Sequence, residues 1–177
     1  RNGAGAVYLK SIYCNSIINT TFVHNSVKKG DGGSLLIIKV ISINLIGCLY
    51  VRNFASFGGS ISLLKSQNIS IINCTFDSNK ATRNGGALHI KDVKKMVNTN
   101  CSFHGNIANW AGAILIENLN IYLNTLCLFT GDLAKSCSSL WLQNLDYSVY
   151  KRTVFYEGKA SWGGVMFIDE SGRSYFI

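Results

Sequence analysis

Apolar and polar residues alternate in short segments that recur along the whole chain. Each segment follows a pair of small residues, usually two glycines, and we call the second member of the pair the anchor. The second and fourth residues after every anchor are apolar, as Leu88 and Ile90 are after Gly86. A period of two is typical of a strand with one buried face, so each repeat is predicted to open with a β-strand. The anchors are Gly5, Gly33, Gly59, Gly86, Gly112, Ser138 and Gly164, with successive spacings of 28, 26, 27, 26, 26 and 26 residues.

An aromatic residue follows each of the first six anchors at a constant distance of 17 residues. It belongs to a Cys-x-Phe pattern that predicts another strand, and a further short strand is expected between the two, near 43–46 and 69–72. All length variation falls between the aromatic residue and the next anchor, which predicts a turn there. Three short strands per repeat and no helical period predict an all-β fold. We expect a single-domain right-handed parallel β-helix over residues 1–177, with six to seven coils of about 26 residues.

Stacked coils place like residues above one another at about 4.8 Å, so the repeat columns predict three ladders of side chains. The aromatic column should form an internal stack, and an asparagine column should satisfy the backbone of the turns. A cysteine column lies two residues before the aromatic one. The predicted ladders are Phe22, Tyr50, Phe76, Phe103, Phe129 and Phe155; Asn25, Asn53, Asn79 and Asn106; and Cys48, Cys74, Cys101 and Cys127.

Composition supports strands and argues against two classes of function. Proline is absent, 47% of the residues are hydrophobic, and the net charge is +8. The lysines and arginines are scattered rather than gathered in a known module, so we expect no nucleic-acid binding. The longest apolar run, residues 35–51, is interrupted by Lys39 and follows the repeat, so we expect no membrane span. The chain begins and ends within the pattern, which suggests a piece of a longer chain or assembly.

The repeats resemble those of the polymorphic outer-membrane proteins of chlamydiae. The residues that carry the resemblance are GGALHI with CTFDSNKA, and AGAILI with CSFHGNIA. The resemblance covers nearly the whole chain, and departs from the pattern at Asp132 and at Cys137-Ser138. It implies a β-helical rod that is secreted or displayed on the cell surface and that serves adhesion or structure.

The cysteine column has three interpretations. Metal ligands must converge, whereas a ladder spreads them along an axis, and parallel side chains suit a disulfide poorly. We favour buried free thiols that act as small apolar residues. Cys14 and Cys137 lie off the column, and Cys137 could approach Cys127. No metal or other cofactor is expected.

Four N-x-[ST] sequons predict N-linked glycans. Three of the asparagines fall 14 residues after an anchor, in a column that points outward if the cysteines point inward. Chance is the alternative, since asparagine and serine are abundant. The candidate acceptors are Asn19, Asn68, Asn73 and Asn100.

Enzymes on this scaffold, such as pectin lyases and polygalacturonases, gather acidic residues on one outer face. The nearest approach here is Glu117 and Asp169, two coils apart with Gln143 between them. That separation, about 10 Å, is marginal for the carboxyl pair of an inverting glycosidase. Charge pairing with Lys91 is the favoured interpretation, and no catalytic residue is assigned.

The outward position three residues after each anchor is unusually apolar. It forms either a surface for a protein or glycan partner or local packing between turns and strands. The same two interpretations apply to the aromatic residues two positions before their anchors, Phe57, Trp110 and Trp162. The candidate partner surface comprises Tyr8, Leu36, Leu115, Trp141 and Phe167.

The favoured function is a non-enzymatic subunit of a secreted, glycosylated surface rod or fibril that associates with itself end to end. An open strand edge at each end of a β-helix invites such pairing. The first alternative is an adhesin module that binds a host or matrix partner. A polysaccharide lyase or hydrolase is the second.

Overall fold

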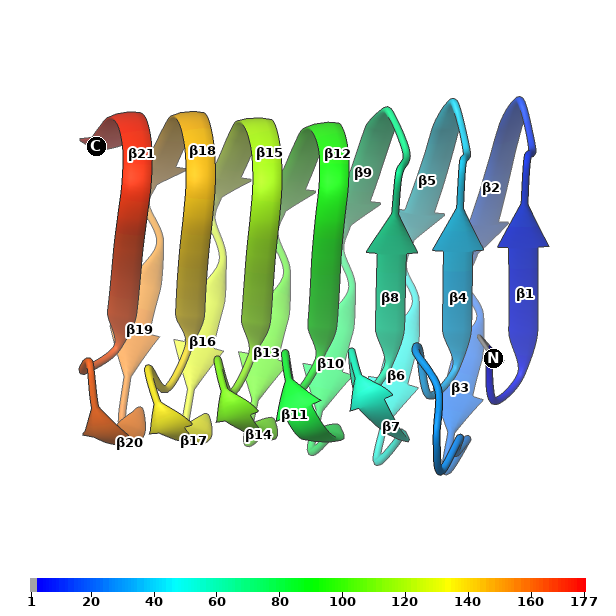
Figure 1. Cartoon of the computed structure of the whole chain (residues 1–177), viewed down its shortest axis with the longest axis horizontal. Helices are drawn as coiled ribbons and strands as arrows, with labels where there is room; N and C mark the ends of the chain where they lie inside the picture. The colour runs from blue at the N-terminus through cyan, green and yellow to red at the C-terminus, as the bar shows by residue number, and fades with distance from the viewer. Residues whose placement is uncertain (1–2) are drawn as a thin grey trace.

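The computed structural model describes residues 3–177, apart from the side chains of residues 170 and 171. These residues form strands and turns without a helix, and every strand pair is parallel. The strands at the front of Figure 1 run upward, and the return strands behind them run downward. Successive coils advance from right to left, from the N- to the C-terminus. The chain therefore winds as a right-handed parallel β-helix, as predicted.

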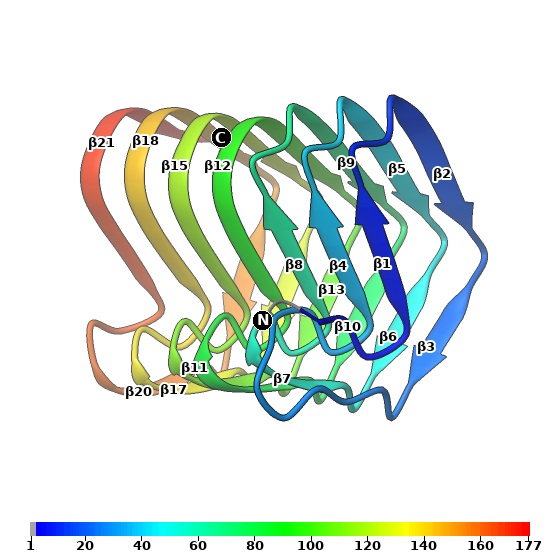
Figure 2. The same ribbon diagram turned by 45° about the vertical axis from the view of Figure 1, so that its right-hand side comes forward.

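The first sheet holds the strands that follow the anchors, and the predicted second strands join its edge. In the later coils these two strands merge into one bent strand of 11 or 12 residues, which curves around the molecule in Figure 2. Its strands are β1 (Val7–Lys10), β4 (Leu35–Ile38), β8 (Ile61–Leu64), β12 (Leu88–Thr99), β15 (Ile114–Thr125), β18 (Leu140–Lys151) and β21 (Met166–Phe176), with β2 (Cys14–Ile18), β5 (Ser42–Ile46) and β9 (Asn68–Ile72).

The second sheet carries the aromatic column on its inner face. Each three-residue strand pairs in register with the next, so that Phe76 lies opposite Tyr50 on one side and Phe103 on the other. Its strands are β3 (Thr21–Val23), β6 (Leu49–Val51), β10 (Thr75–Asp77), β13 (Ser102–His104), β16 (Leu128–Thr130) and β19 (Val154–Tyr156).

The third sheet is a correction, because the segment before each anchor was predicted to be only a turn. It contains a short strand in five coils, at the base of the solenoid in Figures 1 and 2. The length variation is absorbed here: the register of β11 shifts between Ala81 and Asn84, in the repeat of 27 residues. The strands are β7 (Phe54–Phe57), β11 (Lys80–Asn84), β14 (Ile107–Trp110), β17 (Leu133–Ser136) and β20 (Lys159–Trp162).

The glycine pairs have two separate physical causes. The first member adopts a left-handed backbone, with φ of 59° at Gly58 and 63° at Gly85, a conformation that glycine reaches without a steric penalty. The second member has no room for a side chain, since a Cβ on Gly86 would lie 2.0 Å from the carbonyl oxygen of Gly112 in the next coil. The glycine pair thus allows each coil to turn closely against its neighbour.

One continuous hydrophobic core fills the space between the three sheets. The inward residues that alternate along the first sheet, such as Leu88 and Ile90, are fully buried there, together with Phe103. Burial of these columns is the main stabilising contribution to the fold.

Candidate functional site

The asparagine column forms a hydrogen-bonded ladder along the axis. Asn53 Oδ1 accepts from both the backbone N–H and the side-chain amide of Asn25, at 2.9 and 3.0 Å. The Asn53 amide donates onward to Asn79 Oδ1 at 3.0 Å and back to the carbonyl of Phe22 at 2.9 Å. Asn79 and Asn106 repeat the arrangement in the next coils. The ladder therefore satisfies polar groups that the tight turns would otherwise bury unpaired.

Asp132 ends this ladder. Its Oδ1 accepts from the backbone N–H and the side-chain amide of Asn106, at 2.9 and 3.1 Å, and the residue is fully buried. Burial raises the pKa of the Asp132 carboxyl to about 7, against the lowering effect of the bonds from Asn106 and Ser139. Near neutral pH this carboxyl is thus present in both its protonated and its ionised form.

The aromatic column is a continuous stack of six rings, with neighbouring centroids 4.7–5.1 Å apart. The cysteine column beside it is buried, and all its thiols are free. These thiols donate to backbone carbonyls, as Cys74 does to Leu45 and Ile72, and burial raises the pKa of Cys74 to about 11. A thiol with a raised pKa, like that of Cys74, is a poor nucleophile. In the same column a hydrogen bond with Cys101 lowers the pKa of Cys127.

Cys137 does not pair with Cys127 but lies in a second, smaller hydrophobic cluster outside the main core. This cluster corrects the predicted partner surface: Leu36 and Leu115 are buried completely or nearly so, and Trp141 is only 7% exposed. Turn residues of the third sheet cover this column; the Trp110 ring, for example, lies 4.9 Å from that of Trp141. Of the predicted surface only Tyr8 is well exposed, while Phe167 is partly buried against Trp141 at 4.2 Å.

Glu117, the acidic residue considered for a carboxyl pair, lies in an ion pair. Glu117 Oε2 lies 3.0 Å from Lys91 Nζ and 3.5 Å from His89 Nε2. The bond from His89, with that from Lys91, lowers the pKa of Glu117 to about 2 although partial burial opposes the shift. Gln143 and Asp169 follow Glu117 in register. A carboxyl with so low a pKa is ionised at neutral pH and cannot act as a general acid.

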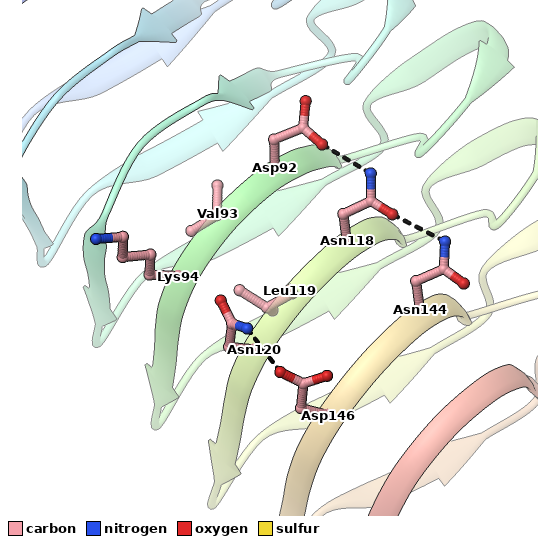
Figure 3. Close-up of a pocket in the computed structure, with 8 residues that line it drawn as sticks. All are labelled: Asp92, Val93, Lys94, Asn118, Leu119, Asn120, Asn144 and Asp146. Carbon is pink, nitrogen blue, oxygen red and sulfur yellow. Dashed lines mark hydrogen bonds between the residues drawn. The ribbon is translucent and has the colours of Figure 1, made fainter.

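A shallow trough of about 350 Å³ runs across the bend of the long strands (Figure 3). Asn118 donates to Asp92 Oδ1 at 2.7 Å, and Asn144 donates to Asn118 Oδ1 at 2.9 Å. Beside this row, Asn120 donates to Asp146 Oδ2 at 2.6 Å. Asp92, Asn118 and Asn144 are thus bonded to one another, and the row forms a second, exposed ladder. The described residues contain no group of three or more potential metal ligands.

The four sequon asparagines are exposed. Asn19, Asn73 and Asn100 share a left-handed backbone with φ of 48–53°, at the corner before the second sheet. Asn100 donates its side-chain amide to Asn73 Oδ1 at 2.9 Å, one coil apart. The column therefore points outward while the adjacent cysteine column points inward.

One coil unites most of these features in a single stretch. It contains the exposed Asn73, the inward Cys74 and Phe76, the ladder residue Asn79 and the glycine anchor Gly86. Residues 73–91 match the family model of the Chlamydia polymorphic membrane protein repeat. The comparisons with curated proteins and with solved structures give no match.

The Chlamydia repeat is associated with the cell surface and outer membrane, so the match indicates a surface-associated repeat protein. In residues 3–177 there is no helix long and apolar enough to cross a membrane. Within the matched stretch, the residues of the repeat lie in the interior ladders and in the glycine turn. The matched stretch thus contains residues of the interior ladders and the glycine turn, together with strand β11 of the third sheet.

The third sheet and its basic side chains are the features that the sequence analysis missed, although it named Trp110 and Trp162 as candidates for a partner surface. The strands of this sheet carry Lys80, Arg83, Lys135 and Lys159 and no acidic residue, together with the exposed Trp110 and Trp162. The lack of acidic residues in five corresponding segments was visible in the sequence, but its meaning depends on a sheet that was not predicted.

Proposed function

We propose that this chain is a non-catalytic structural segment of a secreted or surface-displayed protein, and that its coils stack end to end into a rod or fibril. The observation that carries the proposal is the pair of open edges. Among the described residues, β1, β2, β3 and β7 end the sheets at one side, and β19, β20 and β21 end them at the other. Unpaired strand edges are templates for further pairing.

The two ends of the described residues carry the terminal groups of the ladders. In each rung the asparagine Oδ1 accepts a backbone N–H from the preceding coil, so Asn25 presents Oδ1 to any coil placed before it. Gly158 occupies the ladder position in the last full coil, and its N–H is the corresponding donor. The rings of Phe22 and Phe155 end the aromatic stack on the two sides. A second copy whose β1 pairs with β21 would extend the first sheet, whereas the second sheet ends one coil earlier at β19, so the two ladders would resume after a gap of one rung. Because such a contact is heterologous, it would extend into a filament.

Two further observations support a structural role. The Glu117 carboxylate is engaged by Lys91 and His89 rather than held with a raised pKa beside a second acid. The exposed sequons place possible glycans on the sides of the rod, where they leave the ends free. Both favour a scaffold over a lyase or hydrolase.

Sedimentation and electron microscopy over a range of protein concentrations test the proposal. The wild-type chain should form elongated particles that lengthen with concentration. Phe155→Lys places a charge on the open end of the core and should abolish lengthening, whereas Tyr156→Lys, whose side chain points outward from the same strand, should not. Wild-type particles that stay monomeric at all concentrations would contradict end-to-end stacking.

A second candidate function is adhesion to a host or matrix partner. The buried Leu36, Leu115 and Trp141 do not support it, but the exposed tryptophans of the third sheet do. Adhesion through the side of the solenoid is compatible with stacking at its ends.

A further inference from the structure

The last residue position of the third-sheet strands, beside the first sheet, carries an aromatic residue on every second strand. The residues in register are Phe57 on β7, Asn84 on β11, Trp110 on β14, Ser136 on β17 and Trp162 on β20. Adjacent strands lie about 4.8 Å apart, so the aromatic positions repeat at about 10 Å along the axis. The column therefore combines large flat side chains with small polar ones in strict alternation.

The tryptophans of this column are exposed and fixed in place. Trp110 is 47% exposed and Trp162 is 56% exposed. The buried ring of Trp141 lies between them, at 4.9 Å from Trp110 and 5.9 Å from Trp162, and Phe167 supports Trp162 at 5.5 Å. A ligand that stacks on these rings would meet a preorganised surface, which lowers the entropic cost of binding.

The third sheet is also basic. Its five strands carry Lys80, Arg83, Lys135 and Lys159, all exposed, and no aspartate or glutamate. Among the described residues, the ion pairs are those of Glu117 with Lys91 and His89, and none involves these four cations. Two neighbouring carboxyl groups, those of the buried Asp132 and of Glu157 beside Lys159, lie just outside the strands. The third sheet therefore favours an anionic ligand.

Two shallow hollows lie on this sheet. One, of about 270 Å³, is lined by Ile107, Asn109, Leu133 and Lys135 together with two alanines. The other, of about 480 Å³, is lined by Leu133, Lys159, Glu157, Gly131 and Gly158. Each joins an apolar wall to a lysine, and small residues line both.

These features favour the binding of an extended polymer with a flat repeating unit. A sugar ring offers an apolar face of C–H groups to an aromatic ring and hydroxyls to amides and serines. In an extended polysaccharide each unit advances the chain by about one strand spacing, and in chains whose alternate units are inverted the same face recurs at every second unit. That period equals the alternation of Phe57, Trp110 and Trp162 on the sheet.

We propose that the third sheet, formed by β7, β11, β14, β17 and β20, binds an extended anionic polysaccharide, which lies along the solenoid axis over the exposed tryptophans. Trp110 and Trp162 stack on sugar rings two units apart, and Ser136 and Asn109 lie beside the unit between them. Lys135 and Lys159 pair with its carboxylate or sulfate groups. This binding goes beyond the structural role and is independent of whether the coils stack.

Calorimetric titration with octasaccharides of one length tests the proposal. The probes are a sulfated glycosaminoglycan, a polyuronate and a neutral β-1,4-glucan, with oligothymidylate as a polyanion without sugar-stacking chemistry of this kind. We expect the anionic glycans to bind more tightly than the neutral glycan and oligothymidylate, with affinity that falls as salt is added. Equal or tighter binding of the neutral glycan or of oligothymidylate would overturn the proposal.

Variants locate the site. Trp110→Ala and Trp162→Ala should each weaken binding of the anionic glycan by ~10-fold, and their exposed control is Tyr156→Ala. Because both tryptophans pack on Trp141, Lys135→Glu with Lys159→Glu provides a second test that leaves this packing intact; Lys94→Glu with Lys95→Glu is its control. Tryptophan and lysine variants that bind the anionic glycan as well as their controls would overturn the proposal. The titration repeated on Phe155→Lys separates binding from end-to-end stacking.

Discussion

Ser138 and Gly158 lie against each other, and each departs from the residue type that the repeat has at its position. Ser138 stands where the other coils have an anchor glycine, and Gly158 stands where they have a ladder asparagine or aspartate. A Cβ on Gly158 would lie 2.3 Å from Ser138 Oγ, so the serine side chain occupies the space that an asparagine at 158 needs. The anchor contact also shifts by one residue, since Ser138 N–H donates to Gly164 and Gly112 N–H donates to Cys137.

This contact predicts strong coupling between the two positions. Gly158→Asn alone should destabilise the protein by about 1–3 kcal/mol through overpacking. Ser138→Gly with Gly158→Asn should recover most of the loss, because the asparagine could then accept the backbone N–H of Asp132 as in the other rungs. Denaturant unfolding of the two single variants and the double variant measures the coupling. Additive effects would contradict it.

Asp132→Asn is expected to change the pH dependence of stability. The folded protein holds the Asp132 proton up to about pH 7, whereas an unfolded aspartate releases it near 3.9. The folded state therefore binds more protons between these values, and the free energy of unfolding should fall as pH rises from about 4 to about 7. The contribution lost is on the order of 4 kcal/mol.

Asparagine at 132 would remove this slope and supply an amide donor like those of Asn79 and Asn106. The variant should be the more stable protein at pH 8, as measured by urea unfolding at several pH values. Asp146→Asn, on the exposed face, is the matched control and should leave the slope unchanged. A wild-type stability that stays level from pH 4 to 8 would count against the raised pKa.

The aromatic stack should tolerate change at its end better than at its centre. Phe103 is fully buried between Phe76 and Phe129, so Phe103→Ala is expected to cost about 3–5 kcal/mol. Phe155 has a stacking partner on one side and is only half-buried, so Phe155→Ala should cost clearly less. Midpoints of guanidinium unfolding give the comparison, and equal losses at the two positions would contradict a continuous stack as the source of stability.

Glu117→Gln is expected to lower stability modestly, by less than about 1 kcal/mol, because the ion pair with Lys91 is partly exposed. The wild-type contribution rests on a pKa lowered to about 2, so it is present above the ordinary glutamate pKa and is lost as pH falls towards 2. Wild type and variant should therefore converge at low pH in thermal unfolding. A difference that persists at pH 2 would exclude ion pairing as its cause.

The coil could be predicted from the sequence because equivalent positions of each repeat carry the same type of residue. The constant offset to Phe76, Phe103 and Phe129 fixes the stack, and the alternation after each anchor fixes the first sheet. The third sheet was missed because its short strands lack that alternation and vary in length. Burial of Leu115 was left open for a related reason: it packs with Ala111 and Cys137, which directly follow strands of that sheet.

Glycans on Asn73 and Asn100 should exclude each other in the folded protein. The two asparagines lie one coil apart, and the Asn100 amide donates to Asn73 Oδ1 at 2.9 Å. A glycan on each would crowd two branched sugars into one strand spacing of about 4.8 Å. Because attachment precedes folding, chains modified at both sites should be depleted from the folded fraction. In a host with N-glycosylation, peptide mapping of folded protein should find sugar on at most one of the two, and Asn73→Gln should raise the occupancy of Asn100. Abundant folded protein with sugar on both asparagines would contradict the exclusion.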